Sequence, residues 1–130
     1  TITIANIAHL VLIPAKPSML DLSAIQKSTS IVTMTGQHGF VVLNECKAFG
    51  ELPDQARGLI EGDLSFPVAK QTIGSRVAFV HAANEGKGVI ETEPGSKAAN
   101  EIKALWAYVK KALKTAPVPK EVGERQVANG

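Results

Sequence analysis

Short apolar runs alternate with longer segments of helical periodicity along this chain. The runs at 10–13, 40–43 and 64–69 have the length of strands and show no alternation of apolar and polar residues. Such runs are typical of strands that are covered on both faces, as in a parallel sheet. Pro14 is expected to end the first strand and begin the loop after it, and Pro67 to lie at the end or the edge of its strand, because proline has no N–H group to donate to a neighbour.

The segments between and after these runs have apolar residues every three or four positions, which predicts amphipathic helices. They are expected at 18–34, 53–62, 77–83 and 97–113, with a helix end before residue 8 and a brief extended piece at 89–91. Strands that alternate with helices favour parallel pairing and right-handed crossovers. The predicted fold class is therefore α/β: three layers, with a mostly parallel sheet of about three strands and flanking helices.

Two helix faces are expected to reach the core. Ser18 is a candidate cap for a helix whose stripe carries Leu20, Ala24 and Ile31. In the last helix an apolar face is expected to contain Trp106 together with the following residues: Ala98, Ile102, Leu105, Val109 and Leu113. Lysines gather on a neighbouring flank of the same helix.

The composition limits the size and general class of the protein but does not indicate a function. The chain has 130 residues, a formal net charge of +2 and no apolar run near the roughly 20 residues that cross a bilayer. Residues 1–114 are expected to form one partial α/β domain and residues 115–130 a flexible tail, because the tail has few large apolar residues. Cys46 is the single cysteine, which fits a reducing compartment such as the cytoplasm. Because the chain opens with Thr1 and a helix end, we expect it to be a piece of something longer.

Several kinds of chemistry have no motif in this sequence. There is no G-x-x-x-x-G-K-[ST] loop, no G-x-G-x-x-G, no C-x-x-C and no H-E-x-x-H. The histidines His9, His38 and His81 lie far apart, without companion carboxylates at ligand spacing. We therefore predict no self-contained catalytic set and no metal site within this chain.

Five segments in order do resemble the ParA/Soj/MinD-type deviant Walker ATPases. The first has the family's hydrophobic strand followed by Pro, two residues, Pro and Ser; the others resemble its Leu-Asn strand end and three later motifs. These segments are 10–21, 41–44, 71–76, 82–89 and 94–102. The resemblance implies the second half of a P-loop NTPase fold, in a family that binds and hydrolyses ATP.

The chain also departs from that family. The two-lysine Walker A loop, the switch I aspartate and the Walker B strand would all precede Thr1 and are missing from this sequence. Glu45 stands where arginine often follows the asparagine, Gly74 where proline is common, and Asn84 where proline or serine is usual. ATPase activity is thus expected of a complete protein and not of this chain alone.

The resemblance implies roles for particular residues. Asn44 would hydrogen-bond the adenine edge, since an amide offers both a donor and an acceptor, and Pro67 and Val68 would form an apolar wall for the ring. Pro17 and Asp21 would lie at a nucleotide-dependent dimer interface. Ordinary structural roles stay open: Asn44 capping a turn, and Asp21 lying in the first turn of a helix.

A second implied surface consists of Arg76, Lys103 and Lys110, which would contact non-specific duplex DNA through its phosphates. The alternative is an ordinary solvated helix face, where lysine is common.

Taken with the family, these residues imply part of a cytoplasmic, nucleoid-associated ATPase of plasmid or chromosome partition. The complete protein would use ATP and Mg²⁺, form a homodimer, and act with a ParB-like adaptor and not with a membrane. No tight cofactor binding is expected of this chain alone. Two alternatives are a stand-alone, non-catalytic interaction module derived from the same fold, and a related ATPase of cell-division placement. The polar tail, without an amphipathic membrane helix, argues against the latter.

Overall fold

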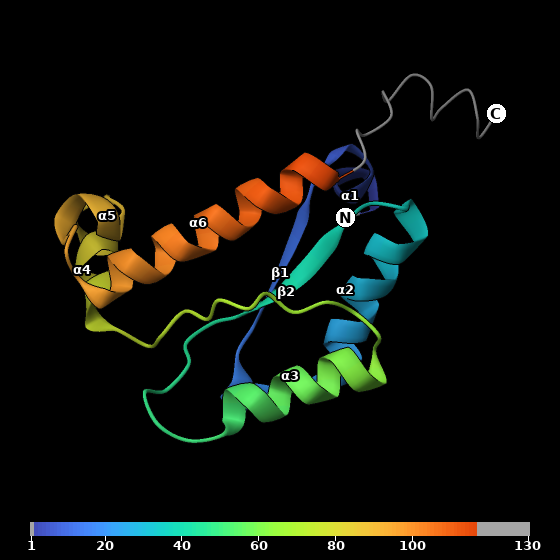
Figure 1. Cartoon of the computed structure of the whole chain (residues 1–130), viewed down its shortest axis with the longest axis horizontal. Coiled ribbons are helices and arrows are strands. Elements are labelled where there is room, and N and C mark those ends of the chain that lie inside the picture. Colours follow the sequence, from blue (N-terminus) through green and yellow to red (C-terminus); the bar gives the residue numbers. More distant parts are fainter. Residues whose placement is uncertain (1, 117–130) are drawn as a thin grey trace.

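The computed structural model describes residues 2–116 as a mixed α/β fold with two parallel strands and flanking helices (Figure 1). In chain order the elements are α1 (Ile2–Ile7), β1 (Val11–Ala15), η1 (Pro17–Met19), α2 (Leu22–Thr35), β2 (Gly39–Leu43), α3 (Leu52–Asp63), α4 (Val77–Asn84), α5 (Val89–Thr92) and α6 (Lys97–Thr115). The predicted α/β class with parallel strands is confirmed.

Strand β2 lies in the middle of the sheet. On one side it pairs with β1 in parallel, in a register that runs from Val11 opposite Gly39 to Ala15 opposite Leu43. On its other side runs the segment 66–74, which forms two isolated parallel bridges, Val41 with Val68 and Cys46 with Gly74.

The expected third strand is thus reduced to single bridges. Ser65 has a left-handed backbone (φ 49°) just before it, and Pro67 lacks an N–H donor. These two residues limit the pairing before Val68, where the Pro67 carbonyl accepts the Val41 N–H at 2.9 Å and the Ala69 N–H donates to the Val41 carbonyl at 2.8 Å. The next bond to β2 comes from the Ile73 N–H to the Leu43 carbonyl, so the segment leaves the ladder between residues 69 and 73 and the two bridges are not continuous.

Helices pack against both faces of the sheet, and Figure 1 shows α6 on one side of the strands and α2 and α3 on the other. One face of β2 directs Val41 and Leu43 toward α2 and α3, and both side chains are fully buried. The other face directs Phe40 and Val42 toward α6. A separate small cluster, made mostly of alanines, joins α4 and α5 to the start of α6.

Strand β1 forms an edge of the sheet. Its residues 11, 13 and 15 direct their main-chain groups toward β2, as the bonds from the Val11 N–H to His38 and from the Asn44 N–H to Ala15 show. Leu12 and Pro14 therefore direct theirs outward, where no strand of residues 2–116 pairs with them. Pro14 was expected to end the strand, but it stays within it because its missing N–H falls on this open side.

The start of the second helix differs from the prediction. Pro17 opens a 3-10 turn instead, and α2 begins at Leu22 with Asp21 as its cap, whose carboxylate accepts the Ala24 N–H at 3.2 Å. The expected Ser18 cap is therefore wrong. The stripe that reaches the core shifts with the helix start, to Ile25, Thr29 and Val32. The helix ends as expected at Gly36, which has the left-handed backbone (φ 71°) that glycine adopts without strain.

Two further expectations are wrong. Residues 89–92 form the short helix α5 and not an extended piece, since the Glu91 carboxylate accepts the Gly88 N–H at 3.0 Å and closes its first turn. In α6 the side chain of Trp106 is 54 % exposed, and Leu113 is also exposed. The half-buried Tyr108 faces the sheet instead, with its ring 4.8 Å from that of Phe40 in an edge-to-face arrangement.

The predicted tail lies mostly outside the described residues. Thr115, its first residue, ends α6 and Ala116 caps that helix, while residues 117–130 lie outside the described part of the chain. Among the helices of the described part of the chain, none combines the length and hydropathy needed to span a membrane.

The buried face of α3 supplies a test of this packing. Ile60 is fully buried in the main core and its neighbour Leu59 is 43 % exposed. We expect Ile60→Ala to lower the free energy of unfolding by about 2–5 kcal/mol, because it removes buried methyl groups and leaves a cavity. Leu59→Ala, the matched control, should cost less than about 1 kcal/mol. Urea denaturation measures both, and equal losses would contradict the orientation of α3.

Candidate functional site

A pocket of about 580 Å³ lies where β2 and the segment 66–74 end. Parallel strands bring their carboxyl ends to one edge of a sheet, and ligands of α/β proteins commonly bind there. The walls are mainly apolar and include only a few polar groups. The lining residues are Leu12, Pro14, Val42, Asn44, Glu45, Ile73, Gly74, Ser75, Arg76, Phe79, Val80, Ile102 and Leu105. This volume and lining suit a small, flat organic ligand.

The backbone around Asn44 is held by a ladder of hydrogen bonds to the segment 73–75. The Ile73 N–H donates to the Leu43 carbonyl at 2.9 Å, and the Cys46 N–H donates to the Ile73 carbonyl at 3.0 Å. The Ser75 N–H then donates to the Cys46 carbonyl at 2.9 Å. These bonds lie on both sides of Asn44 in the sequence, so its position depends on the segment 73–75.

The side chain of Asn44 also makes a local turn contact. Its Oδ1 accepts the N–H of Glu45 at 2.9 Å, and Glu45 has a left-handed backbone with φ 52°. The alternative role of Asn44, capping a turn, is therefore seen in the structure. The same half-buried side chain lines the pocket, where its amide nitrogen is a further donor. Lys16, after β1, pairs with Glu45 at 3.7 Å across the two strand ends.

Arg76 and Glu101 connect the pocket wall to helix α6. One carboxylate oxygen of Glu101, Oε2, accepts the Gly74 N–H at 2.9 Å. The other, Oε1, accepts the Nε–H of Arg76 at 3.1 Å and also a shorter bond from its Nη2. A single carboxylate thus holds both the backbone of the 73–76 segment and the guanidinium that follows it.

The charges at this contact shift two pKa values. Burial raises the pKa of the Glu101 carboxyl, but the hydrogen bonds from Arg76 and Gly74, with the charges of Arg76 and Lys97, together hold it below its ordinary value. The hydrogen bond to Glu101 in turn raises the pKa of Arg76. Both groups are therefore charged at neutral pH.

Cys46 offers no nucleophile. The residue is buried beside the pocket backbone, and burial, followed by the charge of Glu101, raises the pKa of its thiol. A raised pKa lowers the fraction of thiolate at neutral pH, and the thiolate is the reactive form.

The structure brings together only some of the sequence-predicted site residues. Asn44 and Arg76 line the same pocket, whereas Pro67 lines a different hollow, beside Phe66 and Tyr108, near the other end of β2. Val68 is buried in the core, and its carbonyl accepts a bond from Arg57 at 3.2 Å. The wall beside Asn44 consists instead of the segment 73–76.

The two residues expected at a dimer interface differ in exposure. Pro17, the first residue of η1, is buried. Asp21 is exposed while it caps α2. Capping leaves part of that carboxylate free to meet another group.

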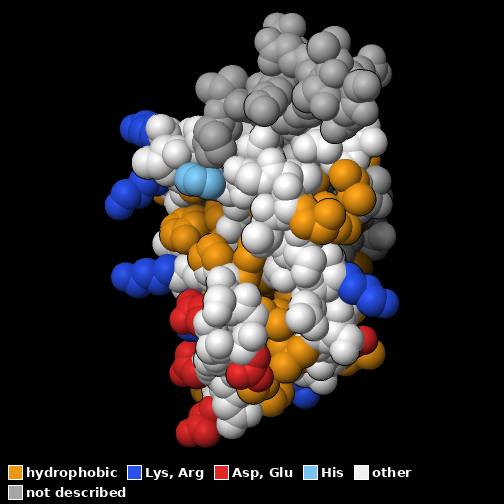
Figure 2. All heavy atoms as spheres, turned by 90° about the vertical axis from the view of Figure 1, so that its right-hand side faces the viewer, with side chains coloured by type: hydrophobic (Ala, Val, Ile, Leu, Met, Phe, Trp, Pro, Cys, Tyr) orange, Lys and Arg blue, Asp and Glu red, His pale blue; other side chains and the backbone are white. Residues whose placement is uncertain are grey.

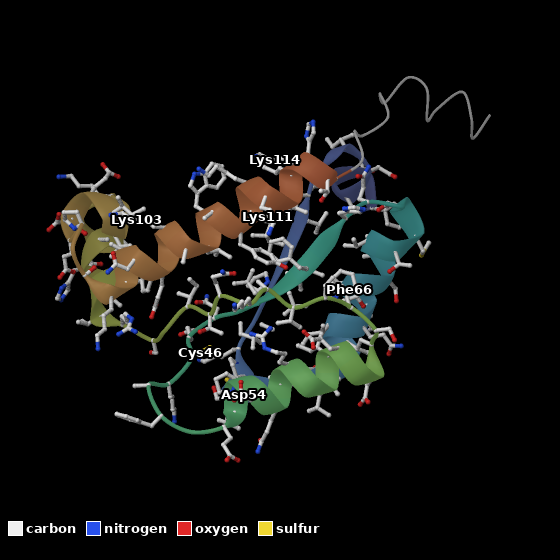
Figure 3. All side chains as sticks on the ribbon, viewed as in Figure 1. Cys46, Asp54, Phe66, Lys103, Lys111 and Lys114 are labelled. Carbon is white, nitrogen blue, oxygen red and sulfur yellow. The ribbon has the colours of Figure 1, made fainter. Side chains whose placement is uncertain are left out.

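The lysines of α6 lie away from the pocket. Lys103 and Lys110 are exposed; the Lys103 ammonium donates to the Pro94 carbonyl at 3.3 Å, and that of Lys110 lies 5.8 Å from the centre of the Trp106 ring. Figure 3 shows Lys103 near the start of α6 and Lys114 near its end. In the side view of Figure 2, acidic side chains gather at the lower end and lysine or arginine side chains lie mainly above them.

Glu101 is the functional residue that sequence reasoning missed. It is the one acidic residue in α6, a helix with five lysines, and it lies next to the apolar position Ile102. That isolation was a usable signal, because a lone carboxylate near a core face usually has a partner. Its partners, however, lie 25 and 27 residues earlier in the chain and follow no spacing rule.

Within residues 2–116 no cluster of three or more histidine, cysteine or acidic side chains is placed to hold a metal ion. Compared with known proteins, the chain matches no family model and has no significant match among curated proteins. The case for a function therefore depends on the geometry of the pocket and of α6.

The Glu101 contacts predict a pH dependence of stability. A carboxyl whose pKa is lowered by folding stabilises the fold above its unfolded-state pKa, and this contribution is lost as the pH falls through the lower folded-state value. Glu101→Gln should therefore be less stable than wild type at pH 7, and the difference should shrink below about pH 4.5. Urea denaturation between pH 7 and pH 3 measures this.

The exposed Glu85 at the end of α4 provides a matched Glu→Gln control, for which only a small change is expected at pH 7. A Glu101→Gln variant as stable as wild type at pH 7 would contradict the role given to these bonds.

Proposed function

We propose that this chain is the carboxyl-terminal portion of a ParA-like ATPase acting in plasmid or chromosome partition, and that its pocket takes the adenine of ATP. The observation that carries the proposal is the pocket beside Asn44 at the carboxyl ends of parallel strands. Its apolar walls suit a purine ring, and the Asn44 amide suits the hydrogen-bonding edge of adenine.

The chain itself supplies the adenine side of such a site. The sequence has no phosphate loop, so the residues that hold the phosphates and Mg²⁺ would come from another part of the protein. In this proposal the sheet is one half of a three-layer P-loop NTPase fold. The loop after β1, with exposed Asp21, would face a second subunit in a nucleotide-dependent homodimer.

The exposed lysines of α6 support a second part of the proposal, contact with duplex DNA. Lys103, Lys110 and Lys114 are exposed and recur at spacings of seven and four, so they follow one stripe of the helix. Such a stripe can neutralise phosphates without reading sequence. A ParB-like adaptor would act on the DNA-bound, nucleoid-associated form.

A stand-alone interaction module derived from the same fold is the alternative. The missing phosphate-loop motif favours it, because purine affinity without phosphate contacts is weak. Nucleotide binding by the complete protein separates the two proposals.

The adenine role of Asn44 is tested by Asn44→Ala. Removing one or two hydrogen bonds to the base should raise the dissociation constant for ATP about 5-fold to 30-fold in the complete protein. Asn100→Ala, at an exposed position of α6, is the matched control and should leave it unchanged. Isothermal titration calorimetry gives both constants, and equal affinities for wild type and Asn44→Ala would rule out contact with the base.

The DNA surface is tested by replacing Lys103 and Lys110 together with alanine. Loss of two phosphate contacts should weaken duplex binding and reduce the slope of log affinity against log salt by about 2. Fluorescence anisotropy at several salt concentrations measures this slope.

Lys27→Ala with Lys47→Ala makes the same charge change at exposed positions of α2 and of the loop after β2. An equal effect of this control pair would show a general charge effect and not a surface on α6.

A further inference from the structure

Arg76 lies on the pocket side of α6 and not on its lysine stripe. The guanidinium is held by Glu101, and along an α-helix Glu101 is about half a turn away from both Lys103 and Lys110. Arg76 also lines the pocket together with Asn44. Its position therefore separates it from the residues that would contact DNA phosphates.

The guanidinium is seated on Gly74. A Cβ atom at position 74 would lie 3.0 Å from the Arg76 Nε, 3.1 Å from its Nη2 and 3.2 Å from its Cζ. Three atoms of one planar group at nearly equal distances mean that the plane lies over the glycine, in space that any larger residue would occupy. Gly74 also donates its N–H to Glu101. A larger residue would keep the N–H, but its Cβ would require the guanidinium to shift.

The charge of Arg76 is already compensated. Glu101 accepts bonds from both its Nε and its Nη2, so the guanidinium is held in one orientation and is not free to follow a phosphate. Its side chain remains 31 % exposed. What it offers a ligand is a fixed, planar, weakly hydrated surface, which is the form in which arginine stacks on aromatic rings.

We propose that Arg76 contacts the ligand of the Asn44 pocket by stacking its guanidinium on a planar purine ring, with Gly74 and Glu101 as the residues that position it. This inference rests on the proposed adenine site and adds the group that covers a face of the base. Asn44 would hydrogen-bond the edge of the ring, and Arg76 would stack on its face.

A direct test needs no substitution. In the complete wild-type protein labelled with ¹⁵N, the Arg76 Nε–H resonance is followed by NMR while ATP is added. A stacked purine shifts this resonance through its ring current, and saturation should follow the dissociation constant for ATP. The Nε–H of Arg57, which lies away from the pocket, should stay in place. An Arg76 resonance that does not move at saturating ATP would overturn the proposal.

Substitutions give the energetic test. Arg76→Lys keeps the charge and removes the plane, so ATP affinity should fall about tenfold while DNA affinity stays unchanged. Gly74→Ala should weaken ATP binding as well, because the new Cβ displaces the guanidinium. Arg57→Lys makes the same chemical change elsewhere and should have no effect on ATP affinity.

The outcomes separate this proposal from the proposed function. Unchanged ATP affinity in Arg76→Lys, with a loss in Asn44→Ala, would remove the stacking role and leave the adenine site. Loss of DNA affinity in Arg76→Lys, with ATP affinity kept, would return Arg76 to the DNA surface. A complete wild-type protein that binds no ATP would remove both proposals.

Discussion

The fold depends on the parallel pairing of β2, which is bonded on both of its sides. This strand contributes the fully buried Val41 and Leu43 to one face of the sheet and Phe40 and Val42 to the other. Because its neighbours run in the same direction, the loops that leave all three segments meet at one edge. The pocket is a consequence of that direction: an antiparallel neighbour would have put Ile73 and Gly74 at the opposite end from Asn44.

Helix α6 joins two surfaces that lie far apart around its axis. Its inner side packs Ile102, Leu105 and Tyr108 against the sheet and holds the 73–76 segment through Glu101. Its outer side carries exposed lysines. Since Glu101 is charged and bonded to three donors, a change in the pocket wall acts on the helix through a short, polar contact and not only through soft apolar packing.

Much of the fold could be predicted from the sequence, and the limits have physical causes. The apolar runs at 10–13 and 40–43 have no alternation and became the two paired strands, but only β2 is covered on both faces; Leu12 and Pro14 leave one face of β1 exposed. The run at 64–69 was also expected to form a strand, but Ser65 and Pro67 limit its start and the chain leaves the ladder between residues 69 and 73, so only bridges remain. Periodicity placed α6 correctly, yet it could not tell that Tyr108 and not Trp106 would face the sheet, because both fit an apolar stripe of that width.

For the site, the resemblance to the partition ATPases pointed to Asn44, and the structure places a pocket beside it. The partners of Asn44 were not predictable in the same way. Glu101 reaches Gly74 and Arg76 across more than twenty residues, and only the packing of α6 on the sheet decides that they meet. Pro67, by contrast, lies in the segment that pairs with β2, but near the start of β2, whereas Asn44 follows its end.

The outward side of β1 also affects how readily two copies of the molecule associate. Leu12 offers this side both an N–H and a carbonyl, whereas Pro14 offers a carbonyl alone. If the β1 edges of two copies paired, a carbonyl of each copy would face a Pro14 that has no N–H to donate. The proline therefore disfavours aggregation through this edge. The mismatch arises from the N–H that Pro14 lacks, so any strand that added at this position would meet it, whatever its sequence.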